Sequence, residues 1–587
     1  MLEQFSLADR EFQLLGLVGF FRALWRLAGP YWFSEDRWKA RGLLAAVIGL
    51  NLSLIAINVR FNHWNNDFYN AVQNFDSEKF YNQLFLFAGL AVAFVLISVY
   101  QLYLNQMLQI RWRRWLTRRY LHAWLDDQRF YRLQVSRPDT DNPDQRIGED
   151  LNLFVEKTLT LGLSFMNSVV TLISFVAILW TLSGVLRIPL PGGGTFEIPG
   201  YMCWAALIYA LFGSWLTARI GARLVPLNFV QQRVEADFRF RMSRLRENAE
   251  AVALWRGEEA ERVSLSHAFD HVVRNFRSIM YRRKNLMWFT AAYNQLAIIF
   301  PLVVAAPRFF AREIQLGGLM QIASAFGQVQ NALSFLVDSF YLIAEWNAVV
   351  RRLTGFTEAL GEVDVEAHKS SVSVEEADQA QVAVHGLTIA LPGGRSLFKD
   401  LNLEFPPSRS ILVTGPTGSG KSSLLRTISG IWPFGEGYVR IPAGKRVLFM
   451  PQRPYLPIGK LREALIFPEK IEVDDDTMEN LLKECGLPRL AGQLDRDENW
   501  QLFLSGGEQQ RVAFARAILH KPDFIFIDEG TAALDEESEA TLYKLLRKYL
   551  PDVGIVSIGH RSSLEPLHDE RIELFANQPP ATAAAAS

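Results

Sequence analysis

The chain has 587 residues, which is enough for two or more domains, and its 61 Lys and Arg against 62 Asp and Glu leave it almost neutral. This balance gives no electrostatic reason to expect nucleic acid as a partner. The two cysteines, Cys203 and Cys485, provide neither a disulfide framework nor a cysteine metal site.

The hydropathy pattern divides the chain into a membrane part and a soluble part. A helix needs roughly 17–25 mostly apolar residues to cross hydrocarbon, and six such windows occur in about the first 350 residues. We place these spans at about 42–59, 82–106, 162–183, 199–217, 287–307 and 318–344. The rest has the pattern of a soluble α/β protein. The polar, acidic start MLEQFSLADREFQ predicts no cleavable signal peptide.

Basic residues in the connections indicate the orientation. Six Lys and Arg precede the first span, ten lie in 107–161 and fourteen in 218–286, whereas the three alternate connections contain two, one and two. Cytoplasmic loops of membrane proteins are enriched in Lys and Arg. We therefore expect both termini, both long connections and the soluble domain in the cytoplasm. This alternation argues against the other interpretation, buried helices of a large soluble protein.

These patterns divide the chain into five segments. They are an N-terminal cytoplasmic segment with an elbow helix (1–41), a transmembrane domain (42–355), a linker (356–380), a soluble domain (381–575) and a disordered tail (576–587). The linker and the tail are assigned because VDVEAHKSSVSVEEADQA and NQPPATAAAAS lack periodic apolar residues.

A phosphate-binding loop gives the soluble domain its chemistry. ILVTGPTGSGKSSLLRTISG sets an apolar strand, a glycine-rich loop and a helix in series, and residues 415–422 match G-x-x-x-x-G-K-[ST]. Backbone N–H groups of such a loop surround phosphate oxygens, Lys421 reaches the β and γ phosphates of ATP, and the Ser422 hydroxyl can bind Mg²⁺. The predicted ATP-binding residues are Gly415, Pro416, Thr417, Gly418, Ser419, Gly420, Lys421, Ser422 and Ser423.

A second apolar strand, FIFIDEG, ends in two carboxylates. Asp528 can hold Mg²⁺, and Glu529 is placed to polarise the water that attacks the γ-phosphate. An acidic pair after a strand is usually a surface turn, but the phosphate loop upstream favours the catalytic interpretation.

The stretch LFLSGGEQQRVAFARAIL resembles the signature motif of ATP-binding cassette (ABC) proteins. The resemblance implies that Ser505 and Gly507 meet the γ-phosphate of ATP bound to another subunit, through the anion-binding end of a helix. It also implies a D-loop at Asp535. The signature set is Leu504, Ser505, Gly506, Gly507, Glu508 and Gln509; the catalytic set is Glu529, Gln452 of the Q-loop and the switch histidine His560; the Mg²⁺ set is Ser422, Gln452 and Asp528.

One position departs from the ABC pattern. Most ABC domains stack adenine on an aromatic residue shortly before the phosphate loop, where this chain has Leu391 and where Phe398 is the candidate substitute. Weaker stacking would affect the selection of the nucleotide rather than its hydrolysis.

The chain contains one phosphate loop, one signature and one set of six spans. Since a composite site takes its loop and its signature from different copies, we expect a homodimer with C2 symmetry. A heterodimer with a second half-transporter is the alternative.

RENAEAVALWRGEEAER, residues 246–262, predicts a short charged helix with a narrow apolar face that ends at Gly257. It resembles the EAA-like motif of the peroxisomal fatty-acyl (ABCD) transporters and their bacterial relatives. NPDQRIGED and MPQRPYLPIGKLREALIFPE resemble further elements of that group. The resemblance implies coupling helices that transmit ATPase motion to the spans; a solvated loop is the alternative. The coupling residues are Asn142, Asp144, Gln145, Glu250, Trp255 and Gly257.

Together these motifs resemble the SbmA/BacA-like branch fused to an ABC domain, a group associated with transport of antimicrobial peptides, bleomycin and vitamin B12. This resemblance implies an all-α six-helix membrane domain of the type IV, exporter-like fold, followed by an α/β P-loop ATPase domain.

Polar residues recur on one face of the first and the sixth span. Polar side chains that face lipid are costly. We therefore expect these residues to line a water-filled cavity, with helix–helix contact as the alternative. The candidate cavity residues are Asn51, Asn58, Gln321, Gln328, Asn331, Asp338 and Glu345, and Asn62 and Asn65 extend the first stripe.

The expected function is ATP- and Mg²⁺-dependent movement, most simply import, of peptides or other bulky hydrophilic solutes across the bacterial inner membrane. An acyl-CoA or lipid transporter of the ABCD type, a multidrug exporter and a non-transporting ABC ATPase are the alternatives.

Overall fold

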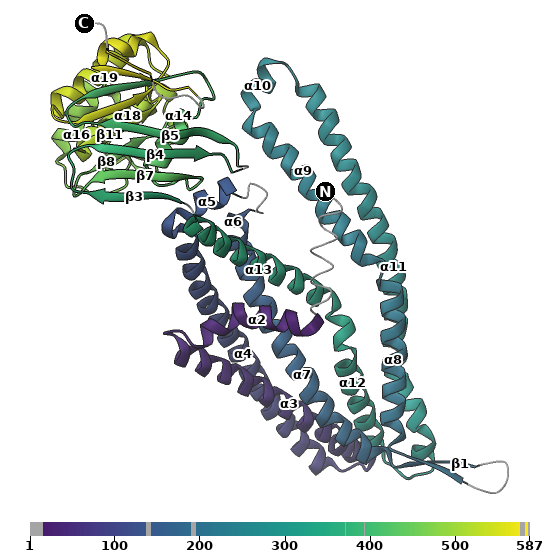
Figure 1. Ribbon diagram of the computed structural model, residues 1–587. Helices are drawn as coiled ribbons and strands as arrows, with labels where there is room; N and C mark the ends of the chain where they lie inside the picture. The colour runs from purple at the N-terminus through teal and green to yellow at the C-terminus, as the bar shows by residue number, and fades with distance from the viewer. Residues whose placement is uncertain are drawn as a thin grey trace. The chain divides into compact units, whose positions relative to one another are not determined.

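The computed structural model describes residues 16–136, 142–189, 195–369, 371–392, 394–575 and 581–584, and their contacts separate into two compact units (Figure 1). The helical unit runs up to Leu121 and then from Asn142 to Phe356. The second unit contains residues 122–136 and the chain from Thr357 onward. The predicted elbow helix is α2 (Gly16–Trp32), and residues 1–15 of the predicted N-terminal segment lie outside the described residues.

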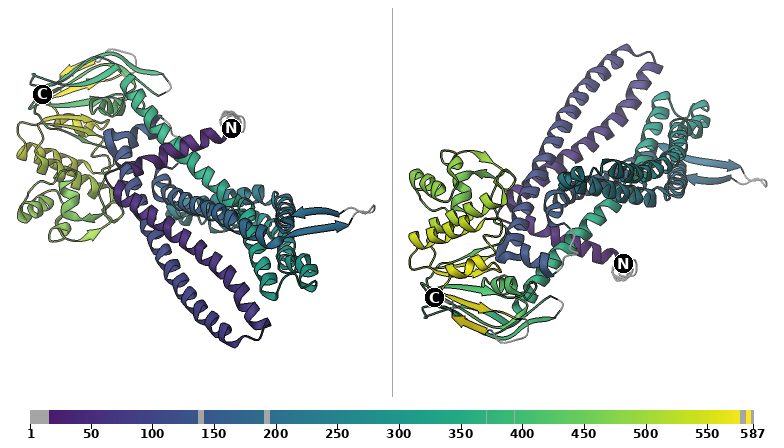
Figure 2. Two further views of the ribbon diagram at one scale, coloured as in Figure 1. Left: turned by 90° about the horizontal axis from the view of Figure 1, so that it is seen from below. Right: turned by 90° about the horizontal axis from the view of Figure 1, so that it is seen from above.

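Helices of very different lengths build the helical unit. They are α2, α3 (Arg37–Gln73), α4 (Ser77–Leu125), α6 (Pro143–Gln145), the π-helix η2 (Arg146–Asp150), α7 (Leu151–Ser183), α8 (Tyr201–Gly221), α9 (Leu224–Glu247), α10 (Ala249–Leu254), α11 (Glu258–Phe310), α12 (Leu316–Asp338) and the first part of α13 (Phe340–Lys369). A hairpin of β1 (Val185–Pro189) and β2 (Thr195–Pro199) joins α7 to α8. Figure 2 shows α3 and α4 side by side, joined where Trp64 Nε1 donates to Gln83 O (2.8 Å).

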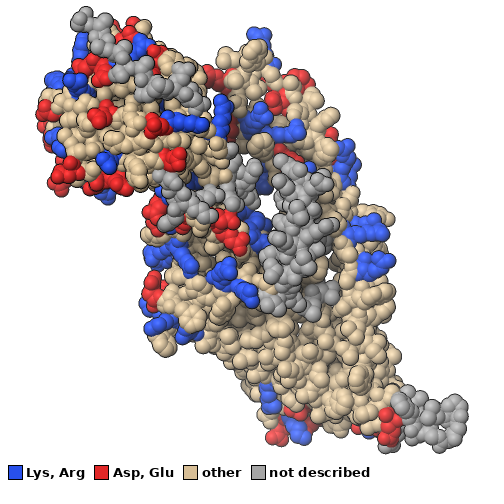
Figure 3. Space-filling model, in the orientation of Figure 1, with Lys and Arg blue, Asp and Glu red and all other residues tan. Residues whose placement is uncertain are grey.

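Five helical stretches among the described residues are long and apolar enough to cross a membrane. They are Arg37–Gln73, Ser77–Ser136, Pro143–Ser183, Tyr201–Glu247 and Glu258–Phe310. Each overlaps one of the first five predicted spans, and only the fourth span, 199–217, begins before its helix. The face shown in Figure 3 carries a broad band of the helical unit without Lys, Arg, Asp or Glu. A band of this kind suits contact with hydrocarbon, where charged side chains are costly.

The predicted sixth span coincides with α12 and the start of α13, with a turn at Ser339 between the two helices. α12 is too polar to be counted with the five apolar stretches. However, it packs against α3, α7, α8 and α11, so neighbouring helices rather than lipid meet much of its surface.

The second unit is built around two sheets. One has the order β14 (Ala581–Ala584), β13 (Glu570–Glu573), β6 (Ser410–Thr414), β12 (Gly554–Ile558), β11 (Phe524–Asp528) and β8 (Val447–Met450); the other has the order β3 (Ser371–Ala377), β7 (Gly435–Pro442), β4 (Val382–Ala390) and β5 (Ser396–Phe405). The strands from β13 to β8 are parallel, and β14 is antiparallel to β13.

Alternating side chains of the larger sheet enter two hydrophobic cores. Ile525 and Ile527 of β11 face one core with α15 (Leu461–Ile466), α16 (Asp475–Glu484), α18 (Gly506–His520) and α19 (Glu536–Tyr549). Phe524 and Phe526 face the other core, with the smaller sheet and α14 (Lys421–Ile428). This two-residue period is the pattern of a strand that is covered on both faces.

Three predicted boundaries are wrong. The predicted linker is instead the end of α13 followed by β3, because Leu360 and Val363 are buried and β3 pairs with β7 through backbone bonds that need no apolar period. Residues 122–136, with η1 (Asp126–Gln128) and α5 (Arg129–Ser136), belong to the second unit rather than to the membrane domain. In the predicted disordered tail, residues 581–584 form β14 on the open edge of β13; residues 576–580 and 585–587 lie outside the described residues.

Candidate ATPase site and coupling elements

The predicted ATPase residues lie at one edge of the larger sheet. The phosphate loop follows β6, Gln452 follows β8, Asp528 and Glu529 end β11, and His560 follows β12. Because these four strands are parallel neighbours, their carboxyl ends share one edge. Ligands of open α/β sheets bind at this edge. The topology thus brings together four segments that are spread over residues 415–560 of the chain.

The phosphate loop depends on its glycines for close approach. Gly415 has a left-handed φ of +149°, and a Cβ there would meet Leu574 O at 2.2 Å. At Gly420 (φ +101°) a Cβ would meet the Phe398 ring at 2.9 Å. Other residues could not take these positions without displacing the strand ends. The buried Ser419 Oγ makes no hydrogen bond within the described residues, which suits an oxygen acceptor supplied by a phosphate.

Lys421 lies folded over this loop. Its Nζ donates to Gly415 O (2.8 Å) and Pro416 O (2.9 Å), so the ammonium is held where phosphate oxygens would arrive. Burial lowers the pKa of Lys421, against the opposing charges of Glu529 and Asp528. Desolvation of this kind strengthens the attraction between the ammonium and an anionic ligand.

Ser422 and Asp528 fit the hard oxygen ligands that Mg²⁺ prefers. Ser422 Oγ donates to Asp528 Oδ1 at 3.1 Å, which brings two of the three predicted ligands together. Burial raises the pKa of Asp528, although the bond from Ser422 opposes this shift. A bound divalent cation would favour the ionised carboxylate and would neutralise charge on the β and γ phosphates.

Glu529 is the centre of a three-residue contact. Its carboxylate accepts from Gln452 Nε2 (2.7 Å) and lies 3.4 Å from His560 Nδ1. Its backbone has a left-handed φ of +49°, which is unfavourable for a residue with a side chain, and its N–H donates to Ile558 O (3.0 Å). A strained backbone conformation of this kind persists only where the surrounding contacts hold it, so these contacts fix the direction of the Glu529 carboxylate. In this contact the third predicted Mg²⁺ ligand, Gln452, is bonded to Glu529.

The signature begins α18 with a capping box. Ser505 Oγ and N both donate to Glu508 Oε2 (2.9 Å each), and Arg489 pairs with Glu508 at 2.7 Å. Ser505 and Gly506 remain exposed. The same helix reaches the D-loop, since Ala533 N donates to Gln510 Oε1 (3.0 Å). Asp535 itself accepts from Ser538 N (2.8 Å) and caps α19.

The predicted substitute for the adenine-stacking aromatic is wrong. Phe398 is 1% exposed and packs in the core between the sheets, beneath Gly420. It therefore presents no face to a nucleotide. Leu391 packs at the edge of the same core.

The charged stretch at residues 246–262 forms the tip of a long helical hairpin. α9 and α11 run side by side, and α10 joins them (Figure 1). Glu250 is exposed and Trp255 is 87% exposed, so the tip presents an apolar ring to solvent. Gly257 was expected to end the helix; instead α10 ends at Leu254, Arg256 takes the left-handed conformation (φ +51°) and Gly257 is the N-cap of α11. A glycine that ends a helix usually stands where Arg256 stands here. Gly257 comes one residue later, and the chain enters α11 directly after it.

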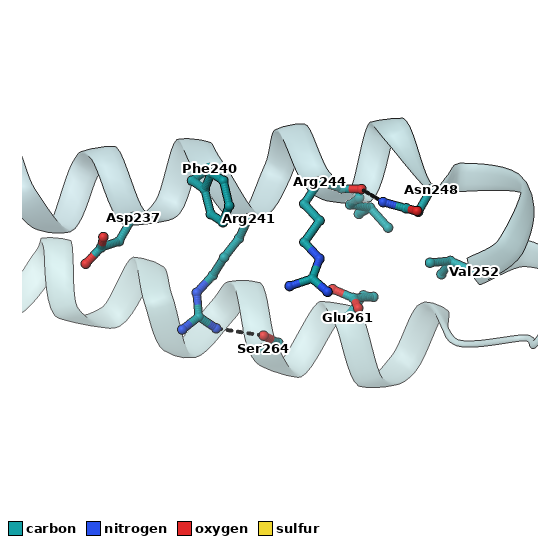
Figure 4. A pocket seen from close by; sticks show the side chains of 9 residues that line it. Asp237, Phe240, Arg241, Arg244, Asn248, Val252, Glu261 and Ser264 are labelled. Atoms are coloured by element: carbon teal, nitrogen blue, oxygen red, sulfur yellow. Dashed lines mark hydrogen bonds between the residues drawn. The ribbon is translucent and has the colours of Figure 1, made fainter. Parts of the chain in front are cut away.

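A groove of about 790 Å³ lies behind this tip, between α9 and α11 (Figure 4). Arg241 Nη1 donates across it to Ser264 Oγ (2.9 Å), and Arg244 and Glu261 point toward one another. Charges of both signs line the groove, so its polar side chains tie the two arms of the hairpin together.

The first long connection contributes a helix, α5, to the ATPase unit, which the sequence does not predict. Val135 of α5 packs against the core of the ATPase unit, and Arg129 Nε donates to Asp364 Oδ1 (2.6 Å). The predicted coupling residues Asn142, Asp144 and Gln145 are exposed and belong to the helical unit instead. The eight residues of α5 are too few to show a clear period, so no sequence signal marked this helix.

Part of the predicted cavity lining forms helix–helix contacts. Gln321 is buried, donates to Asn62 Oδ1 (3.1 Å) and accepts from Asn66 Nδ2 (2.6 Å). Glu345 Oε2 lies 2.5 Å from Lys157 Nζ. The cavity prediction is therefore wrong for the buried Gln321, because interhelical partners meet its polar groups. Glu345 is paired with Lys157, but 32% of its side chain is exposed, so its place in the cavity stays a prediction.

The remaining stripe residues keep more surface. Asn331 and Asp338 are exposed, and Asn58 and Gln328 are half-buried. Asn51 and Asn65 are half-buried as well, but Asn51 Nδ2 donates to Val47 O of its own helix (3.0 Å). With Glu345, the first four remain the candidates for a water-filled pathway.

Two ion pairs, which we term the α7–α13 ion pairs, join the base of α7 to α13. One is Lys157–Glu345; in the other, Asp150 accepts from Arg352 Nε (2.8 Å) and Nη2 (2.6 Å), and Arg146 also bonds to Asp150. The two pairs are seven residues apart on each helix, with the sign of the charge reversed. A slip of one helix by two turns would bring like charges together, so the pairs fix the register of two antiparallel helices.

Comparison with known proteins agrees with this geometry. The family model "ABC transporter transmembrane region 2" matches residues 30–310, and the model "ABC transporter" matches residues 398–532. The structure of a bacterial Atm1-family ABC exporter with ATP bound superposes with a TM-score of 0.69 and 17% identity, over 91% of this chain and 93% of that one. The predicted fold class, an exporter-like helical membrane domain followed by an α/β ATPase, is confirmed.

Three curated proteins are similar over almost the whole chain. The chain is 34% identical to the inner membrane ABC transporter ATP-binding protein YddA of Escherichia coli, over 94% of this chain and 97% of that protein. It is 33% identical to ABC transporter D family member 2, chloroplastic, of Arabidopsis thaliana (95% and 86%) and 27% identical to the lysosomal cobalamin transporter ABCD4 of Mus musculus (94% and 94%). The chain therefore belongs to the ABC transporters, as an ATP-hydrolysing half-transporter that fuses membrane and ATPase domains and is related to the ABCD family.

Proposed function

We propose that two copies of this chain form an importer of bulky hydrophilic solutes, of the peptide or cobalamin class, in the bacterial inner membrane. The termini and the ATPase domain then face the cytoplasm, in agreement with the basic residues of the long connections. Import follows the resemblance to the SbmA/BacA-like branch.

The observation that carries the cargo class is the polar surface of α12. Asn331 and Asp338 are exposed and Gln328 is half-buried on a helix that otherwise packs among α3, α7, α8 and α11. Polar groups at this depth are costly against lipid but suit a water-filled path. The similarity to a protein named as a cobalamin transporter supports the same class of cargo.

Dimer formation completes the ATPase site in this proposal. The exposed Ser505 and the half-buried Gly507 would receive the γ-phosphate of ATP held by the other copy's Lys421, at the positive end of α18. Glu529 then orients the attacking water, with Gln452 and His560 fixing its carboxylate. The exposed apolar tip at Leu254 and Trp255 would transmit ATPase motion to α9 and α11, as the resemblance to the EAA-like motif implies.

The test is uptake and ATPase stimulation in proteoliposomes, with cobalamin, a cationic proline-rich peptide and an acyl-CoA supplied in turn. We expect ATP-dependent accumulation of cobalamin or the peptide, abolished in Glu529→Gln. Asn331→Leu and Asp338→Leu should reduce uptake while basal ATPase remains. Stimulation by acyl-CoA alone would overturn the cargo class in favour of a lipid transporter, and flux only in the opposite direction would overturn import.

A further inference from the structure

Glu539 of α19 is a carboxylate without solvent access, its side chain being 0% exposed. A charge in this position is costly unless hydrogen bonds satisfy it. Thr531 Oγ1 donates to Glu539 Oε2 and Ser563 Oγ donates to Oε1, both at 2.6 Å. Each carboxylate oxygen therefore accepts from one hydroxyl. Thr531 lies in the turn after β11, and Ser563 lies in the 3-10 helix η4 (Ser562–Leu567).

Both segments follow directly after predicted catalytic residues of the ATPase site. Thr531 stands two residues after Glu529, in the segment that leads to the D-loop, and Ser563 stands three residues after His560. Glu539 is thus a buried link between the segment that carries the Glu529 carboxylate and the segment that carries the His560 imidazole. These two groups lie 3.4 Å apart.

Arg561 adds a second link between the same two segments. Its guanidinium donates to Leu534 O and Ala532 O (2.7 Å each) and lies 3.9 Å from Glu539 Oε2. The residue next to His560 therefore binds the backbone of the D-loop segment directly. This pair is a weak source of stability, because the Arg561 side chain is 35% exposed and desolvation of the buried Glu539 offsets the attraction between the two charges. Its stronger effect is geometric, since hydrogen bonds to charged groups are short and directional.

We propose that Glu539 is a positioning residue for ATP hydrolysis, which sets His560 against Glu529 by binding the D-loop segment and the switch-histidine loop at once. Glu539 does not touch the substrate. It acts through the placement of His560, so its effect should vanish where His560 is missing.

The experiment measures kcat and KM for ATP of the full-length protein in nanodiscs. Glu539→Gln replaces one acceptor oxygen by an amide donor, and Thr531→Val removes one hydroxyl with little change of shape. We expect kcat to fall by about tenfold or more, the effect of losing roughly one charge-assisted hydrogen bond, while KM changes less than twofold. Ser563→Ala provides an independent variant if one of these fails to fold.

Tyr543→Phe is the matched control. Tyr543 lies one turn further along α19, is also buried, and shares its hydroxyl with Ser557 (2.8 Å) instead of a loop of the ATPase site. We expect a similar loss of thermal stability with an unchanged kcat.

The decisive comparison adds Glu539→Gln to His560→Ala. If Glu539 acts through His560, the double variant should have the kcat of His560→Ala within about twofold. The proposal is overturned if Glu539→Gln lowers kcat by the same factor in both backgrounds, or if it lowers the Tm as Tyr543→Phe does and leaves kcat unchanged.

Discussion

Replacing Glu345 by Met is expected to destabilise the helical unit more than replacing Lys157 by Met. The two side chains form one ion pair, but the Lys157 side chain is 8% exposed and that of Glu345 is 32% exposed. Without Glu345, a buried ammonium has lost its partner. Without Lys157, the carboxylate can still be hydrated.

The magnitudes follow from this difference in burial. Removing one partner of a fully buried pair costs about 3–5 kcal/mol, and the partial exposure of Glu345 reduces this to about 2–3 kcal/mol for Glu345→Met. We expect about 1 kcal/mol for Lys157→Met, the value of a partly exposed interaction. The charge exchange Lys157→Glu with Glu345→Lys should recover most of the loss. The new charges would lie roughly 10.5 Å along each helix from the like charges of Asp150 and Arg352, where the repulsion is much weaker than the attraction within the close pair.

The assay is thermal unfolding of the purified full-length protein in nanodiscs. The wild type, Lys157→Glu, Glu345→Lys and the exchange variant form a double-mutant cycle, and the two Met variants are measured beside them. Thr158→Val is the matched control, because Thr158 Oγ1 accepts from Trp346 Nε1 (2.8 Å) between the same two helices without charge. Its loss should be smaller than that of Glu345→Met. Equal losses for the two single Met variants, or an exchange variant as unstable as the sum of the single charge reversals, would refute the reasoning.

Three further predictions concern the ATPase and its coupling. Glu529→Gln should still bind ATP but lose at least about 100-fold in hydrolysis, the usual effect of a general base; phosphate release with a parallel nucleotide-binding assay checks this, and unchanged turnover would exclude Glu529 as the base. Ala253→Gly should cost about 1 kcal/mol of helix stability in the exposed α10 and lower cargo-stimulated ATPase far more than basal ATPase, whereas equal losses would indicate misfolding. Burial lowers the pKa of His568 from 6.5, so the unfolded chain binds more protons below about pH 6.5 and stability should fall as the pH decreases toward the lowered value. His568→Gln should flatten this part of the stability profile in denaturant titrations between pH 7 and 5; an unchanged slope would contradict it.

The ATPase residues could be predicted from the sequence because local signals specify them. A glycine-rich loop between a strand and a helix, or two carboxylates at a strand end, needs no knowledge of distant residues. The resemblance to ABC proteins added Gln452 and His560, and the parallel sheet places both beside Glu529.

Contacts between distant segments could not be predicted in this way. Lys157 and Glu345 are 188 residues apart, and Glu539 stands in a helix whose first turn is acidic, where a solvated surface is the usual interpretation. The predicted linker is wrong for a related reason: β3 is held by backbone hydrogen bonds to β7, and a pattern of apolar side chains does not indicate such bonds. Phe398 shows the same limit, since only the packing of the strands decides whether an aromatic faces a ligand or a core.

The polar stripe of α12 shows where periodicity stops being informative. Gln321 and Gln328 are seven residues apart and share one helical face, yet only Gln321 is buried. The difference is its position along the helix: α3 approaches at Gln321, where Asn62 and Asn66 satisfy its amide. Asn331 and Asp338 lie further along the same face and are exposed. Because a polar group that already has an interhelical partner gains little from water, and one without such a partner is costly in lipid, the unburied end of the stripe is where a hydrophilic path should be sought.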